Sequence, residues 1–238
     1  MKKTIITWLK KQVKLSAAKG IILGLSGGID SSVVAHLAKE AVGAKNVFGL
    51  FLPCHSHPHD LKDAKILASK LKIRTKVIDL SCVYDSFVKI LPRGNNLAKA
   101  NLRPRLRMAT LYYFANNLNY LVCGTGNKSE LMAGYFTKYG DGGVDLLPIA
   151  ELTKTQVRKL ANELGVPAQI ISKPPTAGLW PGQTDEGEMG ITYPELDDII
   201  TRIESNRSQV HSKKKVNKVK AMIERSEHKR LGPKICKI

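Results

Sequence analysis

The fold of this chain is constrained most by an alternation of short apolar runs with helical patterns. Strand-like runs span residues 21–25, 47–52, 75–80 and 120–124, and each is bounded by turn-forming residues. Between them lie stretches with the apolar spacing of helices, the longest being LAKANLRPRLRMATLYYFANNL. Strands that alternate with helices of this length predict a doubly wound α/β fold, with a mostly parallel sheet and helices on both faces.

The second half of the chain is less regular. After about residue 125 it becomes richer in Gly, Pro and Thr, through GYFTKYGDGGVDLLP and SKPPTAGLWPGQTDEGEMGITYPE. Long loops in a compact domain are usually functional or disordered. Helical spacing returns in LDDIITRIESN and VNKVKAMIERSEHKR, and the chain has no internal repeat or low-complexity linker. We therefore expect residues 1–238 to form one domain.

Positive charge limits the partners of this chain. It has 38 Lys and Arg residues against 20 Asp and Glu, a formal net charge of +18, which favours nucleic acid, nucleotides and phosphorylated metabolites as partners. Residues 202–238 alone carry 12 basic and 3 acidic side chains. Such a segment repels the basic remainder of the protein, so we expect it to be mobile from about Ser205 onward until bound phosphates offset the repulsion.

The cysteines and the N-terminus bear on location. The chain has no C-x-x-C motif, so neither a disulfide framework nor a zinc knuckle is indicated. At the N-terminus only Thr4–Leu9 lie between lysine pairs, a stretch too short for the core of a signal peptide or for a membrane span. We expect a cytoplasmic protein with no membrane partner.

The turn after the first strand carries the clearest chemical signal. In LGLSGGIDSS, the glycines and the start of a helix offer several backbone N–H groups to one small anion, and glycine allows positive φ and close approach. The turn is not a Walker A loop, because no Gly-Lys-Ser/Thr follows the glycines, and it lacks the G-x-G-x-x-G of dinucleotide folds. We infer a phosphate-binding turn at the carboxyl end of a strand.

This turn resembles the pyrophosphate loop of ATP pyrophosphatases, and further motifs narrow the resemblance to the ammonia-dependent NAD synthetases. These motifs are NLRPRLRM, GTGNKSE, GYFTKYGDGGVDLLPIAELTKTQV, PPTAGLWPGQTDE and SEHKR, in the family's order over nearly the whole chain. The resemblance implies amidation of nicotinic acid adenine dinucleotide (deamido-NAD) by ammonia, using ATP, through an adenylated carboxylate, to give NAD, AMP and pyrophosphate. It also implies a Rossmann-like fold of the adenine nucleotide alpha hydrolase type, Mg²⁺ as cofactor, a homodimer and no glutaminase domain.

Carried over position by position, the resemblance assigns three groups of residues. Asp30 and Lys154 are implied as catalytic, and Asp30 and Glu130 as the Mg²⁺ carboxylates. The implied ATP-binding residues are Gly24, Leu25, Ser26, Gly27, Gly28, Ile29, Asp30, Ser31, Thr125, Lys154 and Thr176. The implied deamido-NAD-binding residues are Arg105, Lys138, Asp145, His228 and Lys229.

Several of these positions also have a plain structural interpretation. Glu130 lies where the first turn of a helix favours a carboxylate, and Lys154 would ordinarily be an exposed lysine near a helix start. The stretch RPRLRM would ordinarily be a solvated basic helix face. Pro104, inside that predicted helix, removes an intrahelical hydrogen bond and can kink the helix, which bears on the reach of Arg105.

A cluster of metal-type side chains follows the second strand. The stretch PCHSHPHD brings together Cys54, His55, His57 and His59, and N and S ligands at this density are compatible with zinc or copper. Such crowding rarely gives tetrahedral geometry. We therefore favour a solvent-facing loop beside the adenine pocket.

Two other functions are compatible with the phosphate-binding turn. A tRNA-modifying adenylating enzyme of the same superfamily would use the same turn, and the positive charge would attract RNA. The sequence has no C-x-x-C motif and no recognisable RNA-binding module, so we do not expect a nucleic-acid partner. A non-catalytic nucleotide-binding module is the other alternative, but simple binding would not need both Asp30 and Glu130.

Overall fold

The protein is built around a parallel sheet, in a computed structural model that describes residues 1–56, 58–176 and 182–237. Its strands are β1 (Gly20–Gly24), β2 (Val47–Phe51), β3 (Arg74–Val77) and β4 (Tyr120–Val122). Their order in the sheet is β3-β2-β1-β4, and every pair is parallel. The strands fall on the four predicted apolar runs, which confirms the predicted α/β class.

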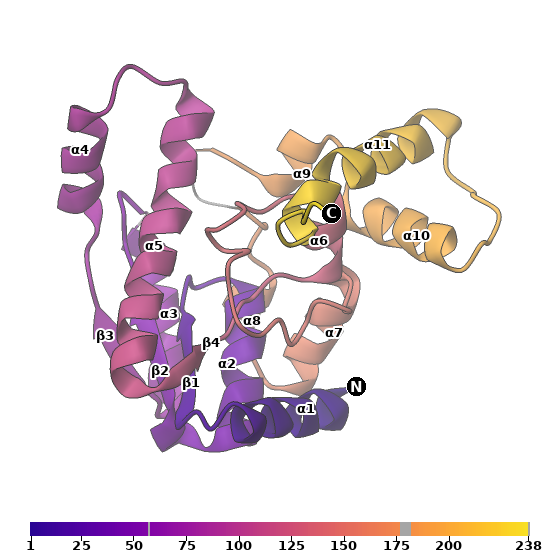
Figure 1. Ribbon diagram of the computed structural model, residues 1–238. Coiled ribbons are helices and arrows are strands. Elements are labelled where there is room, and N and C mark those ends of the chain that lie inside the picture. The colour runs from indigo at the N-terminus through magenta and orange to yellow at the C-terminus, as the bar shows by residue number, and fades with distance from the viewer. Residues whose placement is uncertain (57, 177–181, 238) are drawn as a thin grey trace.

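Helices cover both faces of the sheet (Figure 1), with α4 and α5 on one side and α1, α2 and α7 on the other. A short 3-10 helix (Ala44–Asn46) precedes β2. The α-helices of the described residues are α1 (Lys2–Leu15), α2 (Ile29–Val42), α3 (Pro58–Leu71), α4 (Ser81–Ile90), α5 (Asn96–Leu118), α6 (Lys128–Ala133), α7 (Lys154–Glu163), α8 (Ala168–Ile171), α9 (Asp185–Met189), α10 (Tyr193–Glu204) and α11 (Lys213–Arg230).

The central strand explains why there are two cores. Successive side chains of a strand point to opposite faces, so β1 supplies both layers. Ile21 and Leu23 lie in the cluster that α1, α2, α3 and α7 complete, whereas Ile22 lies in the cluster formed with α4 and α5. A strand that is apolar at every position, as GIILG is, therefore becomes buried on both faces.

Helix α5 runs unbroken across Pro104. It begins at an Asn95 cap, whose side chain accepts a hydrogen bond from the Ala98 N–H at 2.8 Å. Pro104 is buried and faces the loop at Gly140, where an added Cβ would lie 2.9 Å from the Pro104 Cβ. Gly140, which has no Cβ, thus allows that loop to approach Pro104 closely, and Arg105, the exposed residue after the proline, reaches the same loop.

A third apolar cluster joins α6, α9, α10 and α11, which extend away from the sheet in Figure 1. The end of α11 is held by backbone carbonyl groups of α6 and the loop after it. Lys229 Nζ donates to the carbonyls of Gly134 and Phe136 at 2.8 and 3.0 Å, and Arg230 donates to the carbonyl of Leu131 at 3.0 Å. Carbonyl dipoles therefore offset part of the repulsion that we expected to require bound phosphate.

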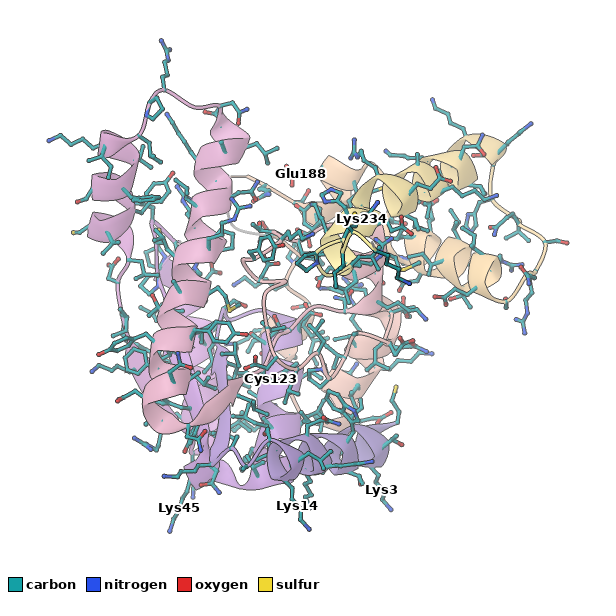
Figure 2. The ribbon with its side chains drawn as sticks, viewed as in Figure 1. Lys3, Lys14, Lys45, Cys123, Glu188 and Lys234 are labelled. Carbon is teal, nitrogen blue, oxygen red and sulfur yellow. The ribbon has the colours of Figure 1, made fainter. Side chains whose placement is uncertain are left out.

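The remaining positive charge is spread over the outer surface. Lys3, Lys14 and Lys45 project outward at the end of the molecule where α1 lies (Figure 2), far from the carboxyl ends of the strands. Within the described residues, no helix is both long and apolar enough to cross a membrane.

Candidate functional site

The turn between β1 and α2 is closed by serine hydroxyl groups. Ser26 Oγ and Ser31 Oγ lie 3.1 Å apart, and the hydroxyls of Ser31 and Ser32 donate to the Gly28 carbonyl at 3.0 and 2.8 Å. Gly28 caps α2 without a side-chain hydrogen bond, so the first N–H groups of α2 can bind an anion. Two further residues of the predicted ATP loop bury apolar side chains in the core and offer only backbone atoms: Leu25 and Ile29.

Only glycine fits without strain at position 27, in the middle of this turn. Gly27 has a φ of +78°, and an added Cβ would lie 2.4 Å from the Asp60 carbonyl oxygen, so the turn packs directly on the start of α3. Lys173 holds the same end of α3 through ion pairs to Asp60 at 2.5 Å and Asp63 at 3.2 Å. Thr176, predicted to bind ATP, follows shortly after Lys173 and is exposed. The turn and the segment before residue 177 therefore share one support.

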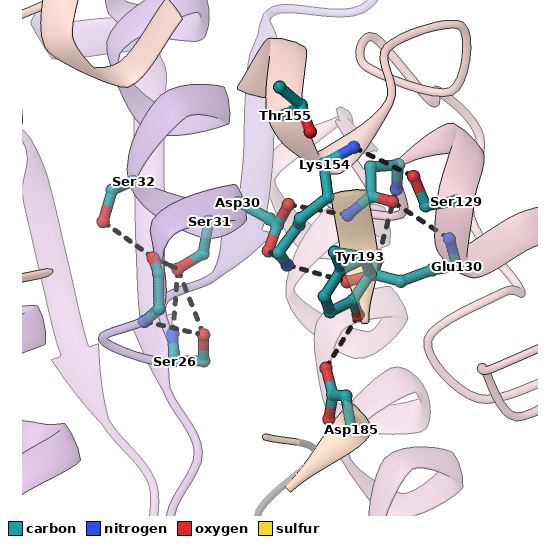
Figure 3. Close-up of polar contacts among 12 residues, drawn as sticks. Ser26, Asp30, Ser31, Ser32, Ser129, Glu130, Lys154, Thr155, Asp185 and Tyr193 are labelled. Carbon is teal, nitrogen blue, oxygen red and sulfur yellow. Dashed lines mark hydrogen bonds and ion pairs between the residues drawn. The ribbon is translucent and has the colours of Figure 1, made fainter. Parts of the chain in front are cut away.

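Three predicted residues from three helices meet at the centre of the site (Figure 3). Lys154 Nζ lies 2.6 Å from an Asp30 oxygen and 3.1 Å from a Glu130 oxygen. The Lys154 side chain is only 3% exposed, so it is not the solvated lysine that its position near a helix start would suggest. The structure brings together both predicted metal carboxylates and the predicted catalytic lysine.

Local sequence fixes Glu130 and Asp30 through one asparagine. Asn127 and Glu130 form a capping box at the start of α6, in which each side chain bonds the other's backbone N–H. The Asn127 side-chain amide also donates to Asp30 at 2.9 Å. Glu130 thus has both its plain helix-start role and a place in the charged group.

Burial sets the electrostatics of this group. Burial raises the pKa of Glu130, because desolvation disfavours its charged form and the nearby Lys154 only partly compensates. Burial also works against the charge on Lys154, but the carboxylates of Asp30 and Glu130 outweigh it and raise the pKa of Lys154. Lys154 is therefore a permanent cation between two acceptors that repel each other.

The backbone of Lys154 is fixed by a buried carboxylate from α10. The Lys154 N–H donates to Ser129 Oγ at 2.9 Å, and the Ser129 hydroxyl donates in turn to Asp197. The second oxygen of Asp197 accepts from the Thr155 N–H at 2.8 Å. Asp197 is 6% exposed, so it ties the start of α7 to α6 and α10 in a water-poor environment.

An aromatic ring covers the lysine. The buried ring of Tyr193, at the start of α10, has its centroid 5.1 Å from Lys154 Nζ. The Tyr193 hydroxyl points away from the lysine toward Asp185, as Figure 3 shows. The group of Asp30, Glu130 and Lys154 is thus shielded on the side of α10.

Thr125, another predicted ATP residue, lies in the half-buried loop between β4 and Asn127.

Four of the five predicted dinucleotide residues gather at a second place, around the loop after α6. Arg105 donates to the Lys138 carbonyl at 3.4 Å, and the Lys138 ammonium contacts the His228 and Leu231 carbonyls at the end of α11. Lys229 bonds the same loop, and burial lowers the pKa of its ammonium. These residues form a basic border to the loop.

The fifth predicted residue, Asp145, is anchored at the end of β4. Its carboxylate accepts from the Val122 N–H at 2.8 Å and from the Tyr112 hydroxyl at 2.9 Å. A cavity of about 310 Å³ beside α5 is lined by Tyr112 together with Arg105 and Tyr139. Asp145 therefore supports one wall of a cavity that Arg105 borders.

The Cys and His residues after β2 do not converge. Cys54 is buried and its thiol faces the Leu80 carbonyl, whereas the His55 ring bonds Asp85 at 2.8 Å. His59 lies in α3, and His57 is outside the described residues. Across the part of the chain that the structure describes, no three His, Cys, Asp or Glu side chains form a metal-binding group.

Sequence reasoning missed several residues that shape the site. Asn127 had a recognisable signal, because Asn-x-x-Glu before a helix is a capping pattern. Ser129, Asp197 and Tyr193 carried no such signal, since their importance depends on α10 packing beside α6 and α7.

Comparison with known proteins gives a consistent set of relatives. A family model described as NAD synthase matches residues 1–233. The chain is similar to an NH(3)-dependent NAD(+) synthetase of Carboxydothermus hydrogenoformans, with 48% identity over 97% of this chain and 94% of the relative. Among solved structures, it is similar to the NMN synthetase from Francisella tularensis (TM-score 0.92, 38% identity, covering 100% of this chain and 97% of that one). It is also similar to an NH3-dependent NAD synthetase from Campylobacter jejuni (TM-score 0.87, 30% identity, 99% and 97% covered).

Proposed function

Because this chain belongs to the NAD synthase family, we propose that it is a ligase that amidates deamido-NAD with ammonia and ATP, giving NAD, AMP and pyrophosphate. The observation that carries the proposal is the group of Asp30, Glu130 and Lys154 beside the phosphate-binding turn, in a chain 48% identical to an ammonia-dependent NAD synthetase. The relatives favour this reaction over tRNA modification and over binding without turnover.

The turn between β1 and α2 and the group of Asp30, Glu130 and Lys154 have different roles in the first chemical step, the adenylation of the substrate. The carboxylate of the substrate attacks the α-phosphorus of ATP, and the bond to the departing pyrophosphate breaks. The N–H groups at the start of α2 hold the phosphates, and Lys154 carries positive charge where negative charge develops. The buried position of Lys154 strengthens this interaction, because little water screens it.

Asp30 and Glu130 suit Mg²⁺, since both offer hard carboxylate oxygens at one place and come from different helices. Bound there, Mg²⁺ would neutralise phosphate charge. Asn127 orients both carboxylates, since its side-chain amide donates to Asp30 and its backbone N–H donates to Glu130, and Lys154 relieves their mutual repulsion.

Arg105, Lys138, Asp145, His228 and Lys229 are proposed to bind the dinucleotide. Guanidinium and ammonium groups suit its pyrophosphate and carboxylate. The cavity bordered by Arg105, with two tyrosines in its wall, supports this assignment. Asp145 acts through Tyr112, whose hydroxyl it accepts, and its loss would disturb the same wall.

A homodimer is supported by an apolar face that α4, α5 and the segment between them expose. It consists of large side chains that are more than a third exposed: Val83, Phe87, Ile90, Leu91 and Leu97. Exposed apolar side chains gathered on adjacent elements favour association with another copy.

The 1–238 chain is proposed to act as one catalytic unit, because the Lys154 to Asp30 contact joins its helical part to the sheet. The cysteines at 54, 82, 123 and 236 are all unpaired, which supports a cytoplasmic location.

A second candidate substrate is the mononucleotide. The solved NMN synthetase covers the whole chain with a TM-score of 0.92. The acid form of NMN carries the same pyridine carboxylate as deamido-NAD, so the same adenylation would apply to it.

The proposed function is tested by incubating the protein with ATP, Mg²⁺, ammonium chloride and either deamido-NAD or nicotinic acid mononucleotide. We expect NAD, AMP and pyrophosphate in equal amounts with the dinucleotide. Faster turnover of the mononucleotide would assign that substrate instead. Pyrophosphate release with bulk tRNA and with neither nucleotide would contradict the proposal.

A further inference from the structure

Asp185 is a buried carboxylate with one oxygen left without a partner. Its side chain lies at the first residue of α9 and is 4% exposed. One oxygen, Oδ2, accepts a hydrogen bond from the Tyr193 hydroxyl at 2.9 Å. The other, Oδ1, is buried and has no hydrogen-bond partner among the residues that the structure describes. A buried carboxylate oxygen without a donor is costly, so its retention calls for a ligand that brings one.

The position of Asp185 connects it to the reacting groups. The Tyr193 ring separates Asp185 from Lys154, whose ammonium lies 5.1 Å from the ring centroid (Figure 3). Lys154 in turn contacts the two carboxylates beside the phosphate-binding turn. Asp185 therefore lies one aromatic ring away from the place where the substrate carboxylate is adenylated.

The surroundings of Asp185 suit a small cation that carries N–H groups. Glu188, one helical turn further on, accepts from the Tyr135 hydroxyl and from the Gln183 amide at 2.8 Å. Two carboxylates and two tyrosine rings thus share this part of the site. The nearby cation, Lys154, is already engaged by Asp30 and Glu130, and within the described ranges Asp185 forms no ion pair with a lysine or arginine.

The charge balance also suits a group that accepts a proton. Burial raises the pKa of Asp185, and the neighbouring hydroxyls of Tyr193 and Tyr135 and the charge of Lys154 only partly oppose this, while the charge of Asp30 adds to it. A carboxylate with a raised pKa is a better base than an exposed one. This agrees with the geometry, in which no donor of the described residues fills the acceptor position of Oδ1.

From this geometry we propose that Asp185 is the ammonium site of the enzyme: Oδ1 binds NH₄⁺, takes one proton from it and releases NH₃ toward the adenylated carboxylate. The inference rests on the proposed function. The nitrogen lone pair of NH₃ attacks the acyl carbon, the bond from that carbon to the AMP oxygen breaks, and AMP leaves with the bonding pair. The surplus proton of the attacking nitrogen passes to solvent, and Asp185 later returns its proton to solvent.

Such a group is needed because most ammonia in neutral water is protonated and has no lone pair with which to attack. A general base in position contributes about 10²-fold to 10⁴-fold to a rate. The nitrogen substrate differs from ATP and deamido-NAD in its positive charge, and the site would separate it from them by using carboxylates rather than basic side chains.

The test separates the two half-reactions in Asp185→Asn. Exchange of labelled pyrophosphate into ATP, dependent on deamido-NAD, reports adenylation, and we expect it to stay within about threefold of wild type. Ammonium-dependent NAD formation near neutral pH should fall by about 100-fold. Hydroxylamine, which is largely neutral at that pH, should form the hydroxamate at nearly the wild-type rate. Raising the pH should restore part of the amidation, because the fraction of free NH₃ rises.

Two controls keep the test decisive. Glu163→Gln removes an exposed carboxylate of α7 and should change none of these rates. Tyr193→Phe keeps the ring and removes only the donor to Asp185, so it should reduce amidation less than Asp185→Asn. Circular dichroism melting checks that each variant is folded.

Each outcome bears on a different claim. Equal losses with ammonium and hydroxylamine, or an unchanged dependence on ammonium, would overturn the ammonium site. Loss of pyrophosphate exchange in parallel with amidation would also overturn it, because the variant would then be defective before ammonia enters. Absence of exchange in the wild-type protein would instead contradict the proposed function itself.

Discussion

Replacing Lys154 with methionine tests how the central charges are held together. The substitution keeps most of the unbranched side chain and removes a cation that lies 2.6 and 3.1 Å from two carboxylates. Those carboxylate side chains are only 16% and 17% exposed, so water would replace the lost charge poorly. Removing one partner of a buried ion pair costs about 3–5 kcal/mol in unfolding free energy.

Glu130 should moderate this loss. Because burial already raises its pKa, it can take up a proton when Lys154 is gone, and we expect a cost near 3 kcal/mol, at the lower end of the about 3–5 kcal/mol range. For a protein of this size, that free energy corresponds to a drop of about 6–12 °C in the midpoint of thermal unfolding. The drop should be larger at about pH 8.5 than at about pH 6, because Glu130 stays ionised and unpaired at the higher pH.

The assay is thermal unfolding in metal-free buffer, followed by circular dichroism at both pH values. Lys2→Met is the matched control, because it removes an exposed ion pair at 2.7 Å to Glu40 and should cost at most about 1 kcal/mol. A midpoint for Lys154→Met within about 2 °C of wild type would refute the reasoning. So would a drop that is larger at the acidic pH.

Three further substitutions have defined outcomes. Gly27→Ala should raise the KM for ATP at least tenfold (about 1.4 kcal/mol), because the new Cβ would meet the Asp60 carbonyl and φ is positive. Asp197→Ala should destabilise the protein by about 2–4 kcal/mol and lower kcat more than it changes KM, because the start of α7 at Thr155 loses its acceptor. The wild type should lose stability as the pH falls below 6.5, since burial lowers the pKa of His36 and only the unfolded chain takes up the proton. In His36→Gln, this pH-dependent loss of stability should be smaller.

Each of these has a check. For Gly27→Ala, an unchanged KM for ATP would mean that the turn does not bind phosphate. For Asp197→Ala, rescue of both stability and kcat by Asp197→Asn is expected, and loss of stability with kcat intact would remove its positioning role. For His36→Gln, parallel melting midpoints in wild type and variant between about pH 7 and pH 5.5 would contradict the titration argument.

The strands and the glycine turn between β1 and α2 could be predicted because their causes are local. An apolar run such as GIILG, a glycine turn and a helix start each follow from neighbouring residues, and β1 and α2 lie where these patterns put them. Glu130 was predictable for the same reason, since its capping box spans only four residues of sequence.

The support of the site could not be predicted in this way. Asp197 matters because α10 packs beside α6 and α7, and its partner Ser129 lies 68 positions away in sequence. The contacts of the C-terminal segment could not be predicted for a related reason. A charge count includes only repulsion, and it leaves out the backbone carbonyls of α6 and of the loop after it that Arg230 and Lys229 contact, while the expected mobility of the segment stays a prediction.

The contact between Lys154 and Asp30 also has a consequence for how the molecule folds. It joins residues 124 positions apart, and the chain must close a long loop before it can form. Contacts of such high sequence separation tend to form late, after the sheet and its adjacent helices. Weakening this contact should therefore speed unfolding more than it slows folding. During synthesis, the N-terminal half would therefore carry the glycine turn and Asp30 before Lys154 can pack beside them.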